Sequence, residues 1–178
     1  MDWQIAFAEI EELLVSLIPK RVRELAIPIP VYCVMVEYYS STVVGDVVPT
    51  LKLPSDSFRR RVQEARGTDA PHFLWSPPEV PHSSDIFTAS LKSDELLAKV
   101  RAHPNLVSRK MARAVALRLN ELDWTQILPV SDGFVVVAAD ATQAFADEFG
   151  DIKASIGERR WTDLIARRLI GATEPYQL

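Results

Sequence analysis

Two histidines and two carboxylates lie close together in one proline-rich stretch, and they are the residues best suited to chemistry. His72 and His82 share the stretch from Thr68 to Asp85 with Glu79 and Asp85 itself. Imidazole and carboxylate groups are zinc ligands, so these side chains could make the chain a small metal-dependent or hydrolytic enzyme. Their spacing matches no metal-binding template, and we therefore expect no bound metal and no other cofactor.

Motifs for nucleophilic catalysis or phosphate binding do not occur in the sequence. The single cysteine, Cys33, lies between hydrophobic residues of a predicted strand, so we expect it to be buried rather than reactive. The six glycines form neither a Walker loop nor a dinucleotide-binding motif. We therefore expect no catalytic residues, and the leading hypothesis is a non-catalytic binding protein. A structural subunit of a homo-oligomer is a third alternative.

Two features indicate where a partner would bind. Trp75 lies in the proline-rich segment from Phe73 to Pro81, where a rigid backbone lowers the entropy cost of presenting an aromatic anchor. A group of acidic residues could attract a basic protein partner. The predicted partner-binding residues are Trp75, Glu79, His82, Asp140, Asp147, Glu148 and Asp151. The alternatives are a tryptophan that fills the protein's own core and a solvated acidic helix face.

The basic residues do not predict nucleic-acid binding. Consecutive arginines at Arg59, Arg60 and Arg61 fan around a helix instead of forming one patch, and no aromatic residues are interleaved with them. The chain has 20 basic and 24 acidic residues, a net charge of −4, which argues against a general affinity for phosphate backbones.

Length and composition predict one domain spanning residues 1–178. A chain of 178 residues with 48% hydrophobic and 25% charged residues is typical of a soluble globular protein. The N-terminus lacks the basic start and apolar core of a signal peptide, and no apolar run is long enough to span a bilayer. With only one cysteine, these features predict a cytoplasmic protein that is not bound to a membrane.

The first part of the chain reads as a helix followed by a strand hairpin. Hydrophobic residues at helical spacing predict a helix over residues 3–18 that Pro19 stops or kinks. Val31 to Tyr39 and Val47 to Leu53 read as strands, and Pro49 places the second of them at a sheet edge or a bulge. A short helix capped by a serine is predicted to run to Arg66.

The second part reads mainly as helices around one strand. We predict helices from Ile86 to about His103 and from Leu106 to Leu122. The long loop before them is either functional or contains a short strand, for which Phe73 to Trp75 is the candidate. Asp132 to Asp140 is apolar on both faces and is predicted to be the central strand. Residues 142–149 and 161–170 look helical. This order predicts an α+β fold with a mostly antiparallel sheet of three to four strands covered by helices.

Several short motifs suggest a family. They are the N-terminal helix with the hairpin from Val31 to Leu53, the stretch Trp75-Ser76-Pro77-Pro78-Glu79, the strand from Phe134 to Asp140, and Lys153-Ala154-Ser155. This layout resembles a bacterial family of uncharacterised cytoplasmic domains, some of whose members are candidate immunity proteins in polymorphic-toxin systems. Val80 stands where that family tends to have an aromatic residue. The resemblance implies a toxin-neutralising binding role and brings no catalytic residues with it.

Overall fold

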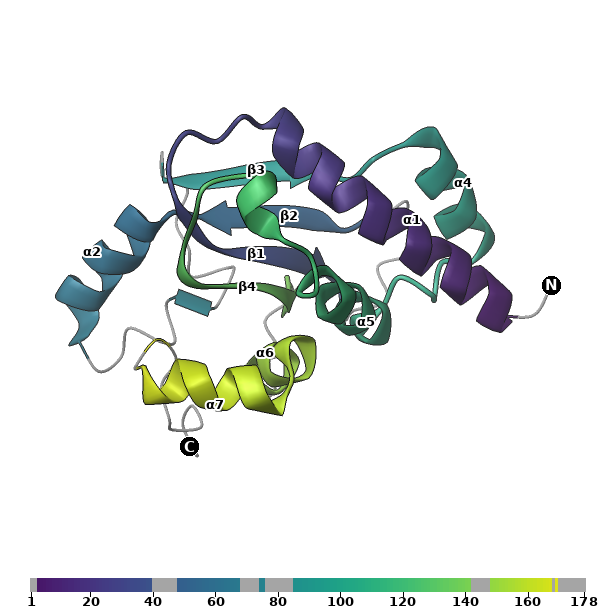
Figure 1. The fold of residues 1–178 in the computed structure, drawn as a ribbon. Coiled ribbons are helices and arrows are strands. Elements are labelled where there is room, and N and C mark those ends of the chain that lie inside the picture. The colour runs from purple at the N-terminus through teal and green to yellow at the C-terminus, as the bar shows by residue number, and fades with distance from the viewer. Residues whose placement is uncertain are drawn as a thin grey trace.

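The computed structural model of the chain describes residues 3–39, 48–67, 74–75, 85–141, 148–167 and 169, without the side chain of Glu148. These residues form one four-stranded sheet with helices on both faces (Figure 1). The strands are β1 Val31–Tyr38, β2 Thr50–Pro54, β3 Ile86–Ser90 and β4 Val130–Asp140. The helices are α1 Trp3–Glu24, α2 Asp56–Arg66, α4 Asp94–Ala102, α5 Arg109–Leu119, α6 Glu148–Ile156 and α7 Glu158–Ala166, with a short 3-10 helix η2 at Trp124–Gln126.

The strand order is β3-β2-β1-β4. β2 pairs antiparallel with both β1 and β3, whereas β1 and β4 run parallel. The predicted α+β fold with a mostly antiparallel sheet is therefore confirmed. The prediction that Asp132 to Asp140 is the central strand is wrong, because β4 lies at an edge of the sheet. β1 is the inner strand that is buried at every position.

Helix α1 has a continuous buried stripe formed by Ile10, Leu14, Ile18 and Val22. The stripe crosses Pro19, and the helix continues through this proline to Glu24 rather than stopping there. A proline inside a helix removes one backbone hydrogen bond and crowds the preceding turn. Burial of the side chains on both sides of Pro19 offsets that cost, since each buried aliphatic side chain contributes about 1.5–3 kcal/mol.

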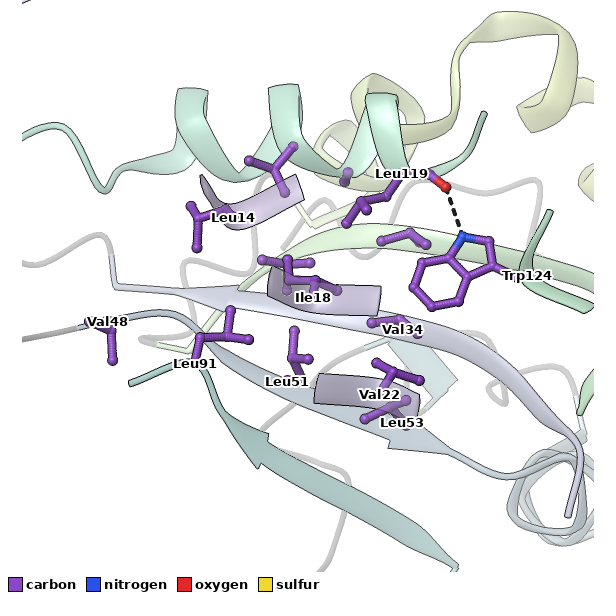
Figure 2. Packing of buried hydrophobic residues seen from close by; sticks show 14 of the residues in the cluster. Leu14, Ile18, Val22, Val34, Val48, Leu51, Leu53, Leu91, Leu119 and Trp124 are labelled. Carbon is purple, nitrogen blue, oxygen red and sulfur yellow. Dashed lines mark hydrogen bonds between the residues drawn. The ribbon is translucent and has the colours of Figure 1, made fainter. Parts of the chain in front are cut away.

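One hydrophobic core lies between the sheet and the helices α1, α4 and α5 (Figure 2). Leu14, Ile18 and Val22 of α1 reach toward side chains of β1 and β2. Trp124 closes one end of this core, and its indole Nε1 donates a hydrogen bond of 2.7 Å to the carbonyl oxygen of Leu119. Its ring also packs on Phe134, with ring centroids 5.5 Å apart.

A second core lies on the other face of the sheet. It contains Cys33 and Met35 of β1, Phe58 of α2, Ile152 of α6 and Leu164 of α7. Helices therefore cover the sheet on both sides, which explains why β4 is hydrophobic on both faces although it is an edge strand. Cys33 is buried, as its sequence context predicted, and burial raises the pKa of its thiol.

The segment from Ile86 to His103 is not one helix as predicted. Its first part is strand β3, and the helix α4 begins only at Asp94. The Ser93 side chain caps that helix by accepting a 3.2 Å hydrogen bond from Leu96 N. An N-cap serine requires extended backbone at its own position, so the helix has to begin after Ser93.

Two smaller predictions also need correction. Pro49 indicates neither an edge strand nor a bulge, because it precedes the first residue of β2, and β2 lies between β1 and β3. Leu74 and Trp75 are helical rather than part of a strand.

The C-terminal helices α6 and α7 are separated by Gly157, whose φ of +78° is a conformation that favours glycine.

Candidate functional site

The outer edge of β4 is closed by side chains, and we call it the sealed edge. In a parallel pair only every second residue of β4 can bond to β1, so the others point outward. Figure 1 shows α6 and α7 beyond β4, on the side of the sheet opposite β3. Side chains that follow α5 or lie on α6 and α7 bond to these outward groups. The bonds are Val136 N to Asn120 Oδ1 at 2.9 Å, Asn120 Nδ2 to Val136 O at 2.7 Å, Ala138 N to Ser155 Oγ at 2.9 Å, and Arg160 Nη2 to Phe134 O at 2.6 Å.

Asn120 is the centre of the sealed edge. Its amide forms a two-way bond with the backbone of Val136 and also donates to Ser155 O at 3.0 Å and to Ala116 O at 2.9 Å. One side chain thus joins α5, β4 and α6. A buried strand edge without such partners would leave polar backbone groups unpaired, at a cost of about 1–3 kcal/mol each.

The outer edge of β3 differs, and we call it the open edge. The 2.8 Å hydrogen bond from Ser55 N to Asp85 O fixes which backbone groups face β2. The register continues with Phe87 opposite Leu53, so every second residue from Asp85 bonds inward. The N–H and C=O groups of the remaining residues point away from the sheet. These residues are Ile86, Thr88 and Ser90.

Within the described parts of the chain, no hydrogen bond reaches the outward backbone groups of β3. Thr88 and Ser90 are exposed to solvent. The strand Ile-Phe-Thr-Ala-Ser contains neither a charged residue nor a proline, which are the usual means by which proteins block an edge strand. The open edge is therefore suited to pairing with another strand.

Charged groups lie at the two ends of β3. Asp85 precedes the strand and forms an ion pair with Arg61 of α2. At the other end Lys92 follows the strand, and its carbonyl oxygen accepts a 3.3 Å hydrogen bond from Arg21 of α1. The open edge therefore begins beside a carboxylate and ends beside a lysine.

Asp151, predicted to bind a partner, lies inside the protein with an exposure of 2%. Its Oδ1 accepts hydrogen bonds from Arg109 Nε at 2.7 Å and from Arg113 Nε at 2.5 Å. Its Oδ2 accepts a 2.6 Å hydrogen bond from the Tyr38 hydroxyl. The carboxylate thus joins α6 to α5 and to the end of β1, and its charge is matched by two arginines of the same chain.

The hydrogen bond to Asp151 also affects the ionisation of Tyr38. Burial raises the pKa of the Tyr38 phenol well above its ordinary range, and the adjacent Asp151 carboxylate raises it further. The phenol therefore stays protonated and acts as a hydrogen-bond donor. Asp140, another predicted partner-binding residue, ends β4 and is half-buried, where its charge acts on both Tyr38 and Arg109.

Trp75 is also buried, with 3% of its surface exposed. Its ring meets the ring of Tyr32 edge to face, at a centroid separation of 5.5 Å and an interplanar angle of 87°. The Tyr32 hydroxyl in turn donates a 2.6 Å hydrogen bond to the carbonyl oxygen of Leu74. This placement corresponds to the alternative considered for Trp75, in which the indole fills the core.

The remaining predicted site residues lie outside the described residues. These are Glu79, His82 and Asp147, together with the side chain of Glu148, whose backbone begins α6. The predictions for them stay predictions. In the described ranges, no group of three or more His, Cys, Asp or Glu side chains is placed to hold a metal ion. No helix in those ranges has the length and apolar character needed to cross a membrane.

A pocket of about 340 Å³ lies near the start of β4, and Asn120, Phe134 and Arg160 of the sealed edge are among the residues that line it. Its polar groups already have roles in the fold. Asp123 accepts hydrogen bonds from the backbone and hydroxyl of Thr125 at the start of η2, and Arg160 donates to the carbonyl oxygen of Phe134. Asp132 forms an ion pair with Arg167. This arrangement stabilises the chain's own loops.

The sequence did contain a signal for the open edge. Ile86, Phe87 and Thr88 are β-branched or aromatic residues that favour strands. Ser93 with two acidic residues after it is a helix-start pattern. Reading these two signals together places a strand before residue 91 and a helix after residue 93.

Comparisons with models of known protein families, with curated protein sequences and with solved structures found no match to this chain.

Proposed function

We propose that this chain is a non-catalytic protein-binding domain that receives an additional β-strand at the open edge. The observation that carries this proposal is the row of outward N–H and C=O groups at Ile86, Thr88 and Ser90. An extended segment placed beside β3 would pair with these groups, as in other proteins that bind by strand addition. Backbone pairing would supply affinity, and the side chains on the two faces of β3 would supply selectivity.

The two faces of β3 present different side chains to an added strand. Phe87 and Ala89 are half-buried and pack at the margin of the α1-side core. Ile86 packs against the core on the other face, and Thr88 is exposed. A strand with small or apolar residues on the α1 side would therefore extend the existing core, and polar residues would suit the opposite face.

Among the described residues, the ionisable groups around Asp151 support a binding role rather than a catalytic one. The cluster around Asp151 consists of a carboxylate matched by Arg109 and Arg113 and a phenol at Tyr38 that stays protonated. Such an arrangement holds α5, α6 and the end of β1 together, because each polar group of the cluster is engaged in a hydrogen bond within the fold. Toxin neutralisation, which the family resemblance implies, is one form of the binding role proposed here.

The proposal can be tested with a displayed library of short random peptides selected on the immobilised chain. Peptides that pair with the open edge should bind wild-type protein and fail to bind the Thr88→Pro variant, because proline lacks the outward N–H and its ring blocks the strand. Thr88→Val is the matched control, since it keeps the backbone donor and should retain binding. Amide hydrogen exchange at Thr88 should slow when a selected peptide is bound.

Selected peptides that bind wild type and Thr88→Pro equally well would overturn the proposal, as would a selection that yields no binder at protein concentrations where the chain is monomeric. Circular dichroism and thermal unfolding of Thr88→Pro establish that the variant is folded. If Thr88→Pro unfolds the domain, a peptide's protection of the Thr88 amide in wild-type protein decides the matter: protection supports strand addition, and its absence contradicts it.

A further inference from the structure

We propose that the strand added at the open edge comes from a second copy of this chain, so that two four-stranded sheets join antiparallel about a twofold axis at Thr88. This inference rests on the proposed function and names its partner. The first argument is the register. An axis at Thr88 places Ile86 of one copy opposite Ser90 of the other, so outward backbone groups meet only outward backbone groups.

The side chains of β3 complement themselves in this register. Phe87 of one copy lies opposite Ala89 of the other, which pairs a large side chain with a small one on the α1 side. Thr88 lies opposite Thr88, and threonine pairs across antiparallel strands are favourable. Neither pairing places a charge at the junction, because β3 contains no charged residue.

The charged residues beyond the ends of β3 also match. Antiparallel pairing brings the start of one β3 to the end of the other. Asp85 of one copy then lies opposite Leu91 of the other copy, beside Lys92. A parallel arrangement would bring the two carboxylates together instead. Charge therefore favours the antiparallel, self-paired arrangement.

Sedimentation velocity over a range of protein concentrations tests the inference on the full chain. Wild-type protein should shift from the 20.0 kDa monomer toward twice that mass as its concentration rises. Because Thr88 faces itself across the axis, Thr88→Lys and Thr88→Glu should each weaken dimerisation by about fivefold through like-charge repulsion. A mixture of the two variants should recover dimers, since lysine then faces glutamate. Thr88→Val is the uncharged control and should dimerise like wild type.

Three results would overturn the inference. They are a wild-type chain that stays monomeric at every concentration, charged variants that dimerise as well as wild type, and a mixture no better than the separate variants. The first result leaves the proposed function intact if selected peptides still depend on the Thr88 backbone. Loss of peptide binding in Thr88→Pro and dimerisation are separate readouts, so the failure of one is distinguishable from the failure of the other.

Discussion

The two outer strands of the sheet expose their backbones in opposite ways. At the sealed edge, side chains from α6, from α7 and from the residue after α5 bond to the outward groups of β4, and α6 lies over them. At the open edge, the outward groups of β3 have no partner among the described residues. The strands also differ in burial, since Phe134 to Ala139 of β4 are all buried whereas no residue of β3 is fully buried.

This difference shows what each edge requires. An apolar strand with unpaired backbone groups is prone to pair with other chains, and proteins usually block or cover such a strand. Covering β4 with helices places its outward backbone groups out of reach of water, so polar side chains have to satisfy them. β3 remains at the surface, where water can satisfy its backbone groups until a strand is added.

The largest expected effect on the free energy of unfolding comes from a comparison of one phenylalanine on each outer strand. Phe134 is 9% exposed and packs on Trp124, so Phe134→Ala should lower the free energy of unfolding by about 3–5 kcal/mol. Phe87 is only half-buried, and Phe87→Ala should cost no more than about 2 kcal/mol. Denaturant unfolding measures both values. A loss below about 1 kcal/mol for Phe134→Ala would mean that β4 is not a covered strand.

The second prediction removes the central amide of the sealed edge. Asn120→Ala should lower the free energy of unfolding by about 2–3 kcal/mol, because both backbone groups of Val136 lose their partner beneath the helices. Thr88→Ala on the open edge is the matched control and should change it by less than about 0.5 kcal/mol at protein concentrations where the chain is monomeric. Amide exchange at Val136 should also accelerate in Asn120→Ala. Equal effects of the two substitutions would contradict the distinction between the edges.

Much of the fold was predictable because local patterns and burial agree. The stripe of α1 and the apolar run of β1 each determine their element from neighbouring residues alone. The position of β4 was not predictable in this way. An apolar run indicates that both faces are covered, and it does not distinguish an inner strand from an edge strand under helices. That distinction depends on Asn120 and Ser155, which are distant in sequence from the groups they bond.

The candidate site was harder to predict for a related reason. The sequence placed partner binding on Trp75 and on the acidic residues, yet Trp75 and Asp151 are both buried. Asp151 is buried because two arginines one helical turn apart on α5 reach it, a pairing that spans about forty residues of sequence. The open edge depends on main-chain groups, which nearly every residue carries, so no particular residue type in the sequence indicates it.

The smallest expected effect at neutral pH concerns the phenol that connects β1 to α6 near the sealed edge. Tyr38→Phe removes the hydrogen bond to Asp151 and should cost about 1–2 kcal/mol at neutral pH. At alkaline pH the raised pKa of Tyr38 also determines how the free energy of unfolding changes with pH. Below about pH 10 the phenol is protonated in both the folded and the unfolded chain, so its contribution to stability is complete. Above that pH the unfolded chain loses the proton while the folded chain keeps it, and stability falls by about 1.4 kcal/mol per pH unit for this group.

Tyr38→Phe should therefore lose stability less steeply than wild type as the pH rises above about 10, although it is the less stable protein at neutral pH. Tyr32 and Cys33, whose pKa values burial also raises, keep their own contributions to the slope in both proteins. Chemical denaturation at a series of alkaline pH values measures the two curves. Convergence of the two curves would show that a protonated Tyr38 holds α6, which lies over the sealed edge. Parallel curves would show that the phenol ionises as freely in the folded chain as in the unfolded one.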